Sequence, residues 1–414
     1  MTSEDFDVVI IGAGPAGTVA GSLLAEAGWR VLALEKSHFP RFSIGESLLP
    51  QSMVYLEQAG LTDSLHAHAK QLGFQYKDGA AFSKNGNYTD FNFSQKFTPG
   101  PGTTYQVKRA AFDNLLADEA QKKGLTIRFG HQVNQIELID EKQYLHVTSD
   151  TEEYQVSARF LLDASGFGRV LPRLLKLDRP SSQPTRNAIF THIKDNITDP
   201  HFDRNKILIS VHPQHEDIWY WLIPFSDGTC SLGVVGLHEQ IEGNSPPLAR
   251  LQAFVAESDN LQPLLENAQW QQDAKMIGGY SVSVSSLHGK GYALLGNAGE
   301  FLDPVFSSGV TIALHSASLI APLVHRILQG ETVDLEQEYA IPLKQGIDCF
   351  RTFVNAWYTG EFQTVIFSSA PQSNNVRDMI SSILAGYAWD TKNPYVAQSE
   401  RRFRVLHTLC KEPL

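Results

Sequence analysis

The first candidate for chemistry is a cluster of glycines near the start of the chain, Gly12-Ala-Gly14-Pro-Ala16-Gly17. Glycines at this spacing bind a dinucleotide when they follow a strand, open a helix and precede an acidic residue by about 20 positions. Here an apolar run comes before them, small residues follow, and Glu35 ends the next apolar run. The motif predicts a dinucleotide site, and its full context disfavours a glycine-rich turn without a ligand.

Each part of the motif has a physical role. Gly12 permits a tight turn, Gly14 lets the backbone approach a pyrophosphate, and Gly17 lets the helix pack closely on the sheet. The helix N-terminus attracts phosphate groups, and the carboxylate of Glu35 can accept hydrogen bonds from ribose hydroxyls.

The elements that must position this motif form a β-α-β unit, with strands expected over residues 6–11 and 30–34 and a helix between them. A strand-rich block follows over 125–163, and its last run, ARFLLDASG, is apolar enough to return to the central sheet. Further strands are expected over 207–235 and 292–296, and helices over 348–407. The sequence therefore predicts an α/β fold with interleaved domains.

Composition indicates a globular protein that does not bind nucleic acid. Of the 414 residues, 42% are hydrophobic, and 45 Asp and Glu against 34 Lys and Arg give a formal charge of -11. Such a surface repels phosphate backbones. The three cysteines are too few and too scattered for a disulfide framework or a zinc site, and the start MTSEDFDVVIIGAG lacks the features of a secretory signal, so a cytoplasmic location is expected.

The stretch 305–324 contains no Asp, Glu, Lys or Arg and has the length of a membrane span. It also contains His315, Pro322 and four serines, which suit a buried helix better than a lipid-facing one. We therefore expect a core helix and no membrane span.

Four later segments identify the dinucleotide. They are RFSIGES at 41–47, QVKR at 106–109 before a helix, DASG at 163–166, and GNA at 296–298 before an Asp-Pro turn. Together they resemble the glutathione-reductase-type FAD fold of aromatic hydroxylases, geranylgeranyl reductases and flavin-dependent halogenases, over about residues 5 to 325. The resemblance implies a cofactor site formed by Gly12, Gly14, Ala16, Gly17, Glu35, Lys36, Arg41, Gly45, Glu46, Ser47, Arg109, Asp163, Ser165, Gly166, Asn297, Asp303, Pro304, Gly309 and Val310. Asn297 replaces the usual Asp, which puts FAD affinity or redox poise in doubt.

The segment Trp219-Tyr-Trp221-Leu-Ile-Pro224 resembles the W-x-W-x-I-P signature of flavin-dependent halogenases. In that family the motif lies beside the flavin and hinders substrate from reaching it, so that ordinary monooxygenation is suppressed. Two indoles at positions i and i+2 project from one face of a strand, which suits such a barrier. The alternative is two tryptophans buried for packing alone.

Lys77, in Gly-Phe-Gln-Tyr-Lys77-Asp-Gly-Ala, resembles the lysine of the same family that presents hypohalous acid to an arene. A lysine is a compact cation with three donors whose pKa falls on burial. The resemblance makes Lys77, Trp219, Trp221 and Pro224 the catalytic candidates. The alternative for Lys77 is a solvent-facing side chain beside Asp78.

The turn Asp303-Pro-Val-Phe-Ser307-Ser308-Gly309-Val310 resembles the family's D-P-x-F-S-S-G-V segment. Unpaired N–H groups and the dipole of the following helix favour an anion at this place, so Ser307, Ser308 and Gly309 are the candidate chloride or bromide site. The same geometry holds the flavin edge in enzymes that bind no halide.

Other residues carry weaker signals. His212 and His215 lie on a strand and loop, where a metal pair is not expected. The glycines around Ser165 and Ser308 do not form a G-x-S-x-G motif. Glu300 could act as a general base, but its flavin-contact segment favours a structural role.

The resemblance implies that a separate flavin reductase supplies reduced FAD, which uses O2 and halide to halogenate an aromatic of phenol or pyrrole type, free or tethered to a carrier protein. We assign an FAD-binding domain to 1–85, 105–180 and 275–335, a substrate-binding sheet domain to 86–104 and 181–274, and a helical segment to 336–414. A non-halogenating monooxygenase, dehydrogenase or reductase on the same fold stays open, as does a catalytically silent flavoprotein.

Overall fold

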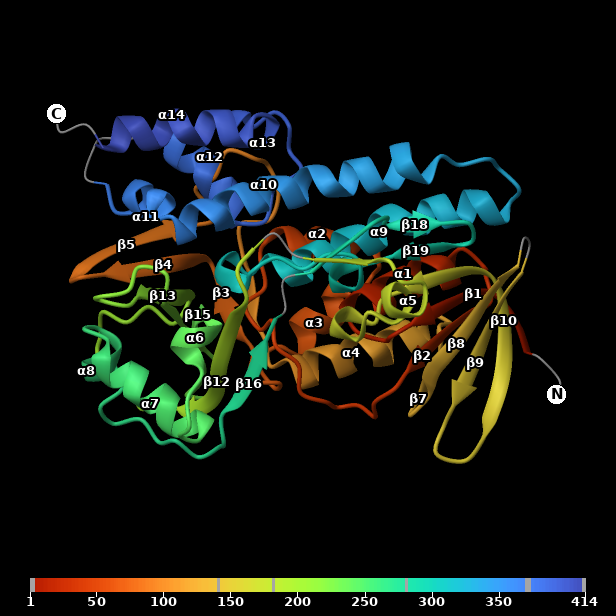
Figure 1. Cartoon of the computed structure of the whole chain (residues 1–414), viewed down its shortest axis with the longest axis horizontal. Helices are drawn as coiled ribbons and strands as arrows, with labels where there is room; N and C mark the ends of the chain where they lie inside the picture. The colour runs from red at the N-terminus through yellow and green to blue at the C-terminus, as the bar shows by residue number, and fades with distance from the viewer. Residues whose placement is uncertain (1–3, 140–141, 181–182, 280–281, 369–373, 412–414) are drawn as a thin grey trace.

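The computed structural model describes residues 4–139, 142–180, 183–279, 282–368 and 374–411. Two sheets lie at opposite ends of the molecule, and helices from the C-terminal part of the chain lie together along one side (Figure 1). The first sheet has eight strands and the second has seven.

The centre of the first sheet is parallel, in the order β19-β10-β1-β2-β7. The helix α1 connects β1 to β2, which confirms the predicted β-α-β unit, and β10 is the predicted return strand. The antiparallel strands β8, β9 and β18 extend this sheet. The bounds are β1 Glu4–Ile11, α1 Pro15–Glu26, β2 Val31–Glu35, β7 Thr126–Phe129, β8 Gln132–Ile139, β9 Lys142–Thr148, β10 Glu153–Asp163, β18 His288–Gly289 and β19 Tyr292–Leu294.

The parallel arrangement brings four predicted site segments to one edge. The residues that follow β1, β2, β10 and β19 all lie at the carboxyl end of their strands, where open parallel sheets bind ligands. The apolar runs of β1 and β10 are buried, as expected of strands covered on both faces.

The second sheet has the order β16-β12-β15-β14-β13-β4-β5. Its strands alternate between two cores: Trp219, Trp221 and Ile223 of β14 belong to the main core, whereas Tyr220 and Leu222 pack toward α7 and α8. The bounds are β4 Gly79–Lys84, β5 Asn87–Asn92, β12 Arg186–Lys194, β13 Lys206–Val211, β14 Trp219–Pro224, β15 Thr229–Leu237, β16 Lys275–Gly278, α7 Pro247–Glu257 and α8 Leu261–Leu264.

The domain boundaries predicted from the sequence are wrong at two places. The sequence assigns β4 and β16 to the FAD-binding domain, but both are strands of the second sheet. β4 pairs in parallel with β13, and β16 pairs antiparallel with β12. Their partners lie many residues away in the chain, so the local pattern of either strand does not show which sheet it joins.

The C-terminal helices confirm the helical prediction for 348–407. The remaining elements are α2 Gln51–Gln58, α3 Thr62–His68, β3 Gln75–Lys77, β6 Thr104–Gln106, α4 Arg109–Lys122, η1 Gly166–Gly168, α5 Val170–Leu174, β11 Asp178–Arg179, α6 His238–Ile241, β17 Ser283–Val284, η2 Gly296–Ala298, η3 Pro304–Phe306, α9 Ser308–Leu328, η4 Glu336–Ala340, α10 Ile341–Tyr358, α11 Glu361–Ile366, α12 Asn374–Leu384, α13 Pro394–Ala397 and α14 Ser399–Lys411.

Within the described part of the chain, α9 is the one helix long and apolar enough to cross a membrane by length and composition. It packs against α1, α2 and α10, and residues such as Ile312, Leu314 and Ile320 are buried in the main core. This is the environment that we expected for a core helix.

The turn after β1 leaves no room for a side chain at position 17. A Cβ on Gly17 would lie 2.1 Å from the backbone oxygen of Gly12, whereas a Cβ on Gly14 would lie 3.6 Å from its nearest neighbour, in Arg41. We expect Gly17→Ala to lower the free energy of unfolding by about 3 kcal/mol, since backbone must move. Gly14→Ala, the control in the same turn, should change it by less than about 1 kcal/mol. Urea unfolding of both variants measures the difference, and equal losses would contradict this account.

Candidate functional site

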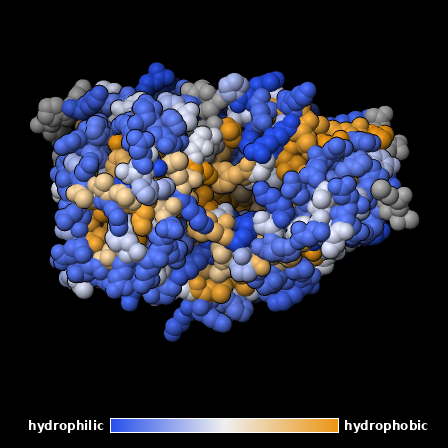
Figure 2. Space-filling model, turned by 60° about the horizontal axis from the view of Figure 1, so that its bottom comes forward, coloured by the Kyte–Doolittle hydropathy of each residue, from blue (hydrophilic) through white to orange (hydrophobic). Residues whose placement is uncertain are grey.

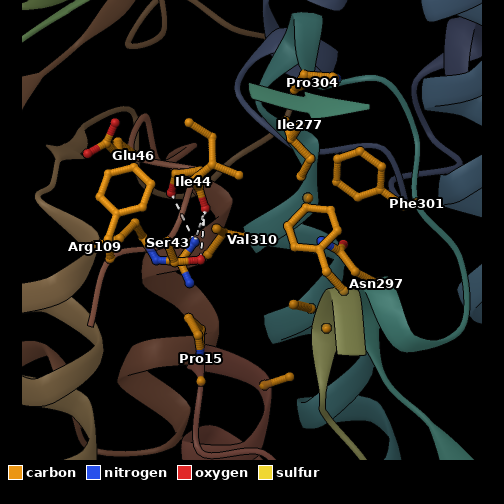
Figure 3. Close-up of a pocket in the computed structure, with 18 of the residues that line it drawn as sticks. Pro15, Ser43, Ile44, Glu46, Arg109, Ile277, Asn297, Phe301, Pro304 and Val310 are labelled. Atoms are coloured by element: carbon orange, nitrogen blue, oxygen red, sulfur yellow. Dashed lines mark hydrogen bonds between the residues drawn. The ribbon is translucent and has the colours of Figure 1, made fainter. Parts of the chain in front are cut away.

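A cavity of about 400 Å³ lies where the carboxyl edge of the parallel sheet meets one face of the second sheet. Loop 43–46 and Arg109 lie on one side of it, Asn297 and Phe301 lie on the other, and Pro15 lies below (Figure 3). The surface in Figure 2 is mostly hydrophilic, with apolar residues gathered around a central hollow. The part of the cavity wall that the second sheet provides is apolar and consists of Ala188, Ile207, Trp219, Trp221, Ile223 and Ile277.

Most of the predicted cofactor residues line this cavity. Those on its wall are Gly14, Ala16, Glu35, Lys36, Arg41, Gly45, Glu46, Ser47, Arg109, Ser165, Gly166, Asn297, Pro304, Gly309 and Val310. The others, Gly12, Gly17, Asp163 and Asp303, lie outside its lining. The motifs that are far apart in the sequence therefore meet at one place.

A second cavity of about 260 Å³ adjoins the first, and Glu35, Lys36, Ser165 and Gly168 line both. It continues along the end of β2 toward His131, Asn134 and Arg173, which no sequence motif indicated. Two joined cavities that meet at the acidic end of β2 fit the two halves of a dinucleotide. The N-terminus of α1 has no side-chain cap, which leaves its first N–H groups for phosphate oxygens.

Glu35 is buried and held by backbone donors. Its Oε2 accepts from the N–H of Ala13 at 3.1 Å, and its Oε1 accepts from the N–H of Ser37 at 3.0 Å. These contacts fix the carboxylate at the junction of the two cavities, as the predicted ribose contact requires.

Arg109 holds the loop beside the cavity. Its Nε and Nη2 donate to Asp113 at 2.8 and 3.0 Å, and its Nη1 donates to the carbonyl of Ile44 (Figure 3). Arg41 donates to the same Asp113 carboxylate at 2.9 Å. Both arginines are thus engaged with the protein, and their contacts fix the segment 41–47 at the cavity wall.

The side chain of Asp163 binds backbone N–H groups of the segment after β10. Its carboxylate accepts from the N–H groups of Ser165 at 2.9 Å and Leu171 at 2.7 Å. Burial raises the pKa of Asp163, although these hydrogen bonds oppose the shift. The residue fixes the turn after β10, which places Ser165 and Gly166 on the cavity wall.

The two indoles stand on the cavity face of β14, as the i, i+2 spacing predicts. Trp219 donates through Nε1 to the hydroxyl of Tyr358 at 2.8 Å, and Trp221 donates to Ser231 Oγ at 3.1 Å. Pro224, at the end of β14, does not line the cavity. The sequence did not indicate the partners Tyr358 and Ser231, because hydrogen bonds between distant segments leave no local pattern.

Lys77 is fully buried, which contradicts the solvent-facing alternative. Its Nζ donates to Ser47 Oγ at 2.8 Å and to the carbonyl of Leu48 at 2.7 Å, and it lies 5.5 Å from the ring centre of Phe93. Burial lowers the pKa of Lys77 to about 7. The side chain is outside the cavity lining, one hydrogen bond behind Ser47, which lines it.

The candidate halide segment lies at the start of the longest helix. Ser307 adopts left-handed backbone with φ of 56°, and α9 begins at Ser308 without a side-chain cap. Ser307 and Gly309 line the cavity, whereas Ser308 is buried outside its lining. Uncapped N–H groups therefore face the cavity end of a 21-residue helix.

The weaker candidates take structural positions. His212 Nε2 donates to Glu257 Oε2 at 2.9 Å, and Glu300 pairs with Arg351 of α10. Among the described residues no group of His, Cys, Asp and Glu could hold a metal ion.

The comparisons with known proteins agree with this site. Residues 5–281 match the family model described as FAD binding domain. The chain is 31% identical over 333 residues to the 1H-pyrrole-2-carbonyl-[peptidyl-carrier protein] brominase of Pseudoalteromonas luteoviolacea, covering 79% of each chain. It is 30% identical to the tryptophan 2-halogenase of Chondromyces crocatus, covering 78% of this chain and 62% of that one.

Two solved structures are similar over almost the whole chain. A flavoprotein/dehydrogenase from Cytophaga hutchinsonii superposes with a TM-score of 0.94 at 40% identity, covering 99% of each chain. A flavin-dependent brominase superposes with a TM-score of 0.82 at 27% identity, covering 97% of this chain and 98% of that one. With the FAD-type fold, the joined cavities and these relatives together, the chain belongs to the flavin-dependent halogenases, a family of FAD-dependent oxidoreductases.

Proposed function

We propose that the protein uses reduced FAD, O2 and chloride or bromide to halogenate an electron-rich aromatic compound of phenol or pyrrole type. The observation that carries the proposal is the apolar wall of the cavity, which contains Trp219 and Trp221, with Lys77 one hydrogen bond behind Ser47. FAD, when bound and reduced, supplies the oxidising chemistry that converts halide into hypohalous acid.

The protein's own residues position and separate the reactants. The indoles form part of the apolar cavity wall, and their Nε1 hydrogen bonds to Tyr358 and Ser231 hold them there. The start of α9 offers N–H groups to a halide at Ser307 and Gly309. The apolar wall excludes water, which protects a reactive oxidant from hydrolysis.

Lys77 supplies the group that would hold hypohalous acid. Its two hydrogen bonds leave one N–H of an ammonium for a further acceptor, and a pKa near 7 keeps amine and ammonium both accessible at neutral pH. A buried amine of this kind suits either a hydrogen bond to the acid or a bond to halogen.

A second candidate function is a non-halogenating oxidoreductase on the same fold. Asn297 stands at the cavity wall in place of the usual Asp, and Lys77 does not reach the cavity lining. The structure that superposes at a TM-score of 0.94 is described as a flavoprotein/dehydrogenase. These observations favour testing for dehydrogenated and hydroxylated products as well.

The partners follow from the same proposal. Two relatives are named as acting on pyrrole-2-carbonyl groups held by a peptidyl-carrier protein, at 31% and 26% identity, which supports a carrier-bound substrate for this chain. We further propose a separate flavin reductase as the source of reduced FAD.

The proposal is tested by mass spectrometry of a complete reaction. The protein is given FAD, a flavin reductase, NADH, O2 and bromide, with phenols and pyrroles offered both free and carrier-loaded. We expect a product with the bromine isotope doublet. A hydroxylated or dehydrogenated product without bromine would replace the proposal by the second candidate.

We expect Lys77→Met, which keeps the apolar stem, to reduce halogenation at least about 100-fold, because the proton donor that holds the oxidant is lost. FAD affinity should stay the same, since Lys77 lies outside the cavity lining. Product analysis and flavin fluorescence titration check the two halves of this prediction. Retained halogenation would remove Lys77 from the mechanism.

The same variant should change how stability depends on pH. Burial lowers the pKa of Lys77 from 10.5 to about 7, so between these values the unfolded chain binds a proton that the folded chain does not. The wild-type free energy of unfolding should therefore rise with pH across this window relative to Lys77→Met, by up to about 1.4 kcal/mol per unit. Urea unfolding of both proteins at pH 7.5, 8.5 and 9.5 measures their free energies of unfolding. The amount by which Lys77→Met is more stable than the wild type should be greatest at pH 7.5 and should shrink as the pH rises. A difference that does not change with pH would contradict the burial argument.

The halide site predicts a separate effect. A Cβ on Gly309 would meet Phe301 at 3.5 Å and Asn297 at 3.7 Å, which are ordinary contacts, so Gly309→Ala should fold normally. The added methyl group would lie on the cavity wall beside the uncapped N–H groups, and we expect the KM for bromide to rise about tenfold. Halide titration at saturating aromatic substrate measures it, and an unchanged KM would place the halide elsewhere.

A further inference from the structure

We propose that Glu46 is a catalytic base that takes a proton from the aromatic substrate, and that His192 is its positioning residue. The inference rests on the proposed function and extends it by naming a proton acceptor. Sequence motifs indicated Glu46 only as a cofactor contact and did not indicate His192.

Glu46 is held rigidly at the cavity wall. Its carbonyl accepts from the N–H of Val107 at 2.7 Å, and the adjacent loop is fixed by Arg109. The side chain is 1% exposed and lines the cavity, with Oε1 2.8 Å from His192 Nε2. The loop and the second sheet therefore meet at this pair of side chains.

His192 lies on β12, the strand that also carries Ala188, a residue of the cavity wall. Its ring packs against Phe42 and Phe225, with centroids at 5.9 and 5.4 Å. These aromatic contacts limit the rotation of the imidazole and keep Nε2 directed at Glu46. Contact with a fixed partner is what orients a catalytic carboxylate.

The second oxygen of Glu46 carries the functional argument. Oε2 is buried and has no hydrogen-bond partner among the described residues. A buried carboxylate oxygen without a partner is costly, so the unpaired oxygen of a residue that lines the cavity points to a missing donor. A phenol O–H, a pyrrole N–H or a ring C–H that becomes acidic would supply that donor.

Glu46 also precedes the residue that contacts Lys77, the candidate that holds the oxidant. Ser47 follows it in the chain and accepts from Lys77 Nζ at 2.8 Å. Two consecutive residues of the loop thus present a carboxylate toward His192 and a hydroxyl toward Lys77. An arene beside this segment would have its base on Glu46 and its oxidant on Lys77, which contacts the neighbouring Ser47.

The proposed step balances. The arene attacks the halogen of hypohalous acid, so a carbon–halogen bond forms and the oxygen–halogen bond breaks with its electron pair on oxygen. The ring carbon then gives its proton to Glu46 Oε2, and the electron pair of the C–H bond restores aromaticity. The hydroxide takes up that proton, so arene and hypohalous acid yield aryl halide and water.

The test is a hydrogen isotope effect on halogenation of a phenol that is deuterated on its ring carbons. In the wild type, proton loss is fast and the effect should stay close to one. In Glu46→Gln, which keeps size and hydrogen bonding, proton loss should become rate-limiting, with an isotope effect of about 2 or more and kcat reduced about 100-fold. FAD affinity, measured by fluorescence titration, should be unchanged.

His192 and a control complete the design. His192→Gln keeps a donor near the Nε2 position and should retain most activity, whereas His192→Phe removes it and should show the raised isotope effect. The matched control is Glu257→Gln, because Glu257 forms a similar 2.9 Å contact with His212 outside the cavity lining. It should leave both kcat and the isotope effect unchanged.

Each result separates the two proposals. Halogenation by Glu46→Gln with an isotope effect close to one overturns the role of Glu46 as base while the proposed function stands. Loss of FAD affinity in Glu46→Gln overturns it in favour of a cofactor contact. The absence of any halogenated product from the wild type overturns the proposed function and this inference together.

Discussion

The buried carboxylate of Asp113 is the contact on which the rest of the site depends. It accepts two hydrogen bonds from Arg109 and one from Arg41. Arg109 in turn donates a hydrogen bond to the carbonyl of Ile44 and so holds the loop in place. A buried charge without partners is strongly destabilising, so the cluster favours one arrangement of the loop. That loop carries the cavity residues 41–47. Removing the charge of Asp113, Arg109 or Arg41 would therefore displace this part of the cavity wall.

The loop connects three functions within a few residues. Gly45 lines the cavity, Glu46 contacts His192, and Ser47 contacts Lys77. The side chains of Glu46 and Ser47 therefore serve different partners although they are neighbours in the chain. The loop therefore couples the cofactor part of the cavity to the part lined by the second sheet.

Much of the fold could be predicted from the sequence because its signals are local. Gly12, Gly14 and Gly17 mark a turn, apolar runs mark β1 and β10, and the i, i+2 spacing of the indoles gives their shared face. The assignment of β4 and β16 failed because pairing between distant strands leaves no trace in either strand alone. The hydrogen bond from Trp219 to Tyr358 and the pair of Glu46 with His192 were missed for the same reason.

Lys77 is held by the same loop, through its hydrogen bonds to Ser47 and Leu48. A lysine at this depth loses hydration, which lowers its pKa, and the oxygens of Ser47 and Leu48 offset part of that cost. The same burial shields the amine from water. Under the proposed function, Trp219 and Trp221 would keep the aromatic substrate from the flavin, and a small oxidant would be the species that passes between them. Separation of this kind is what halogenation requires, since direct contact of substrate with the flavin would instead favour hydroxylation or dehydrogenation.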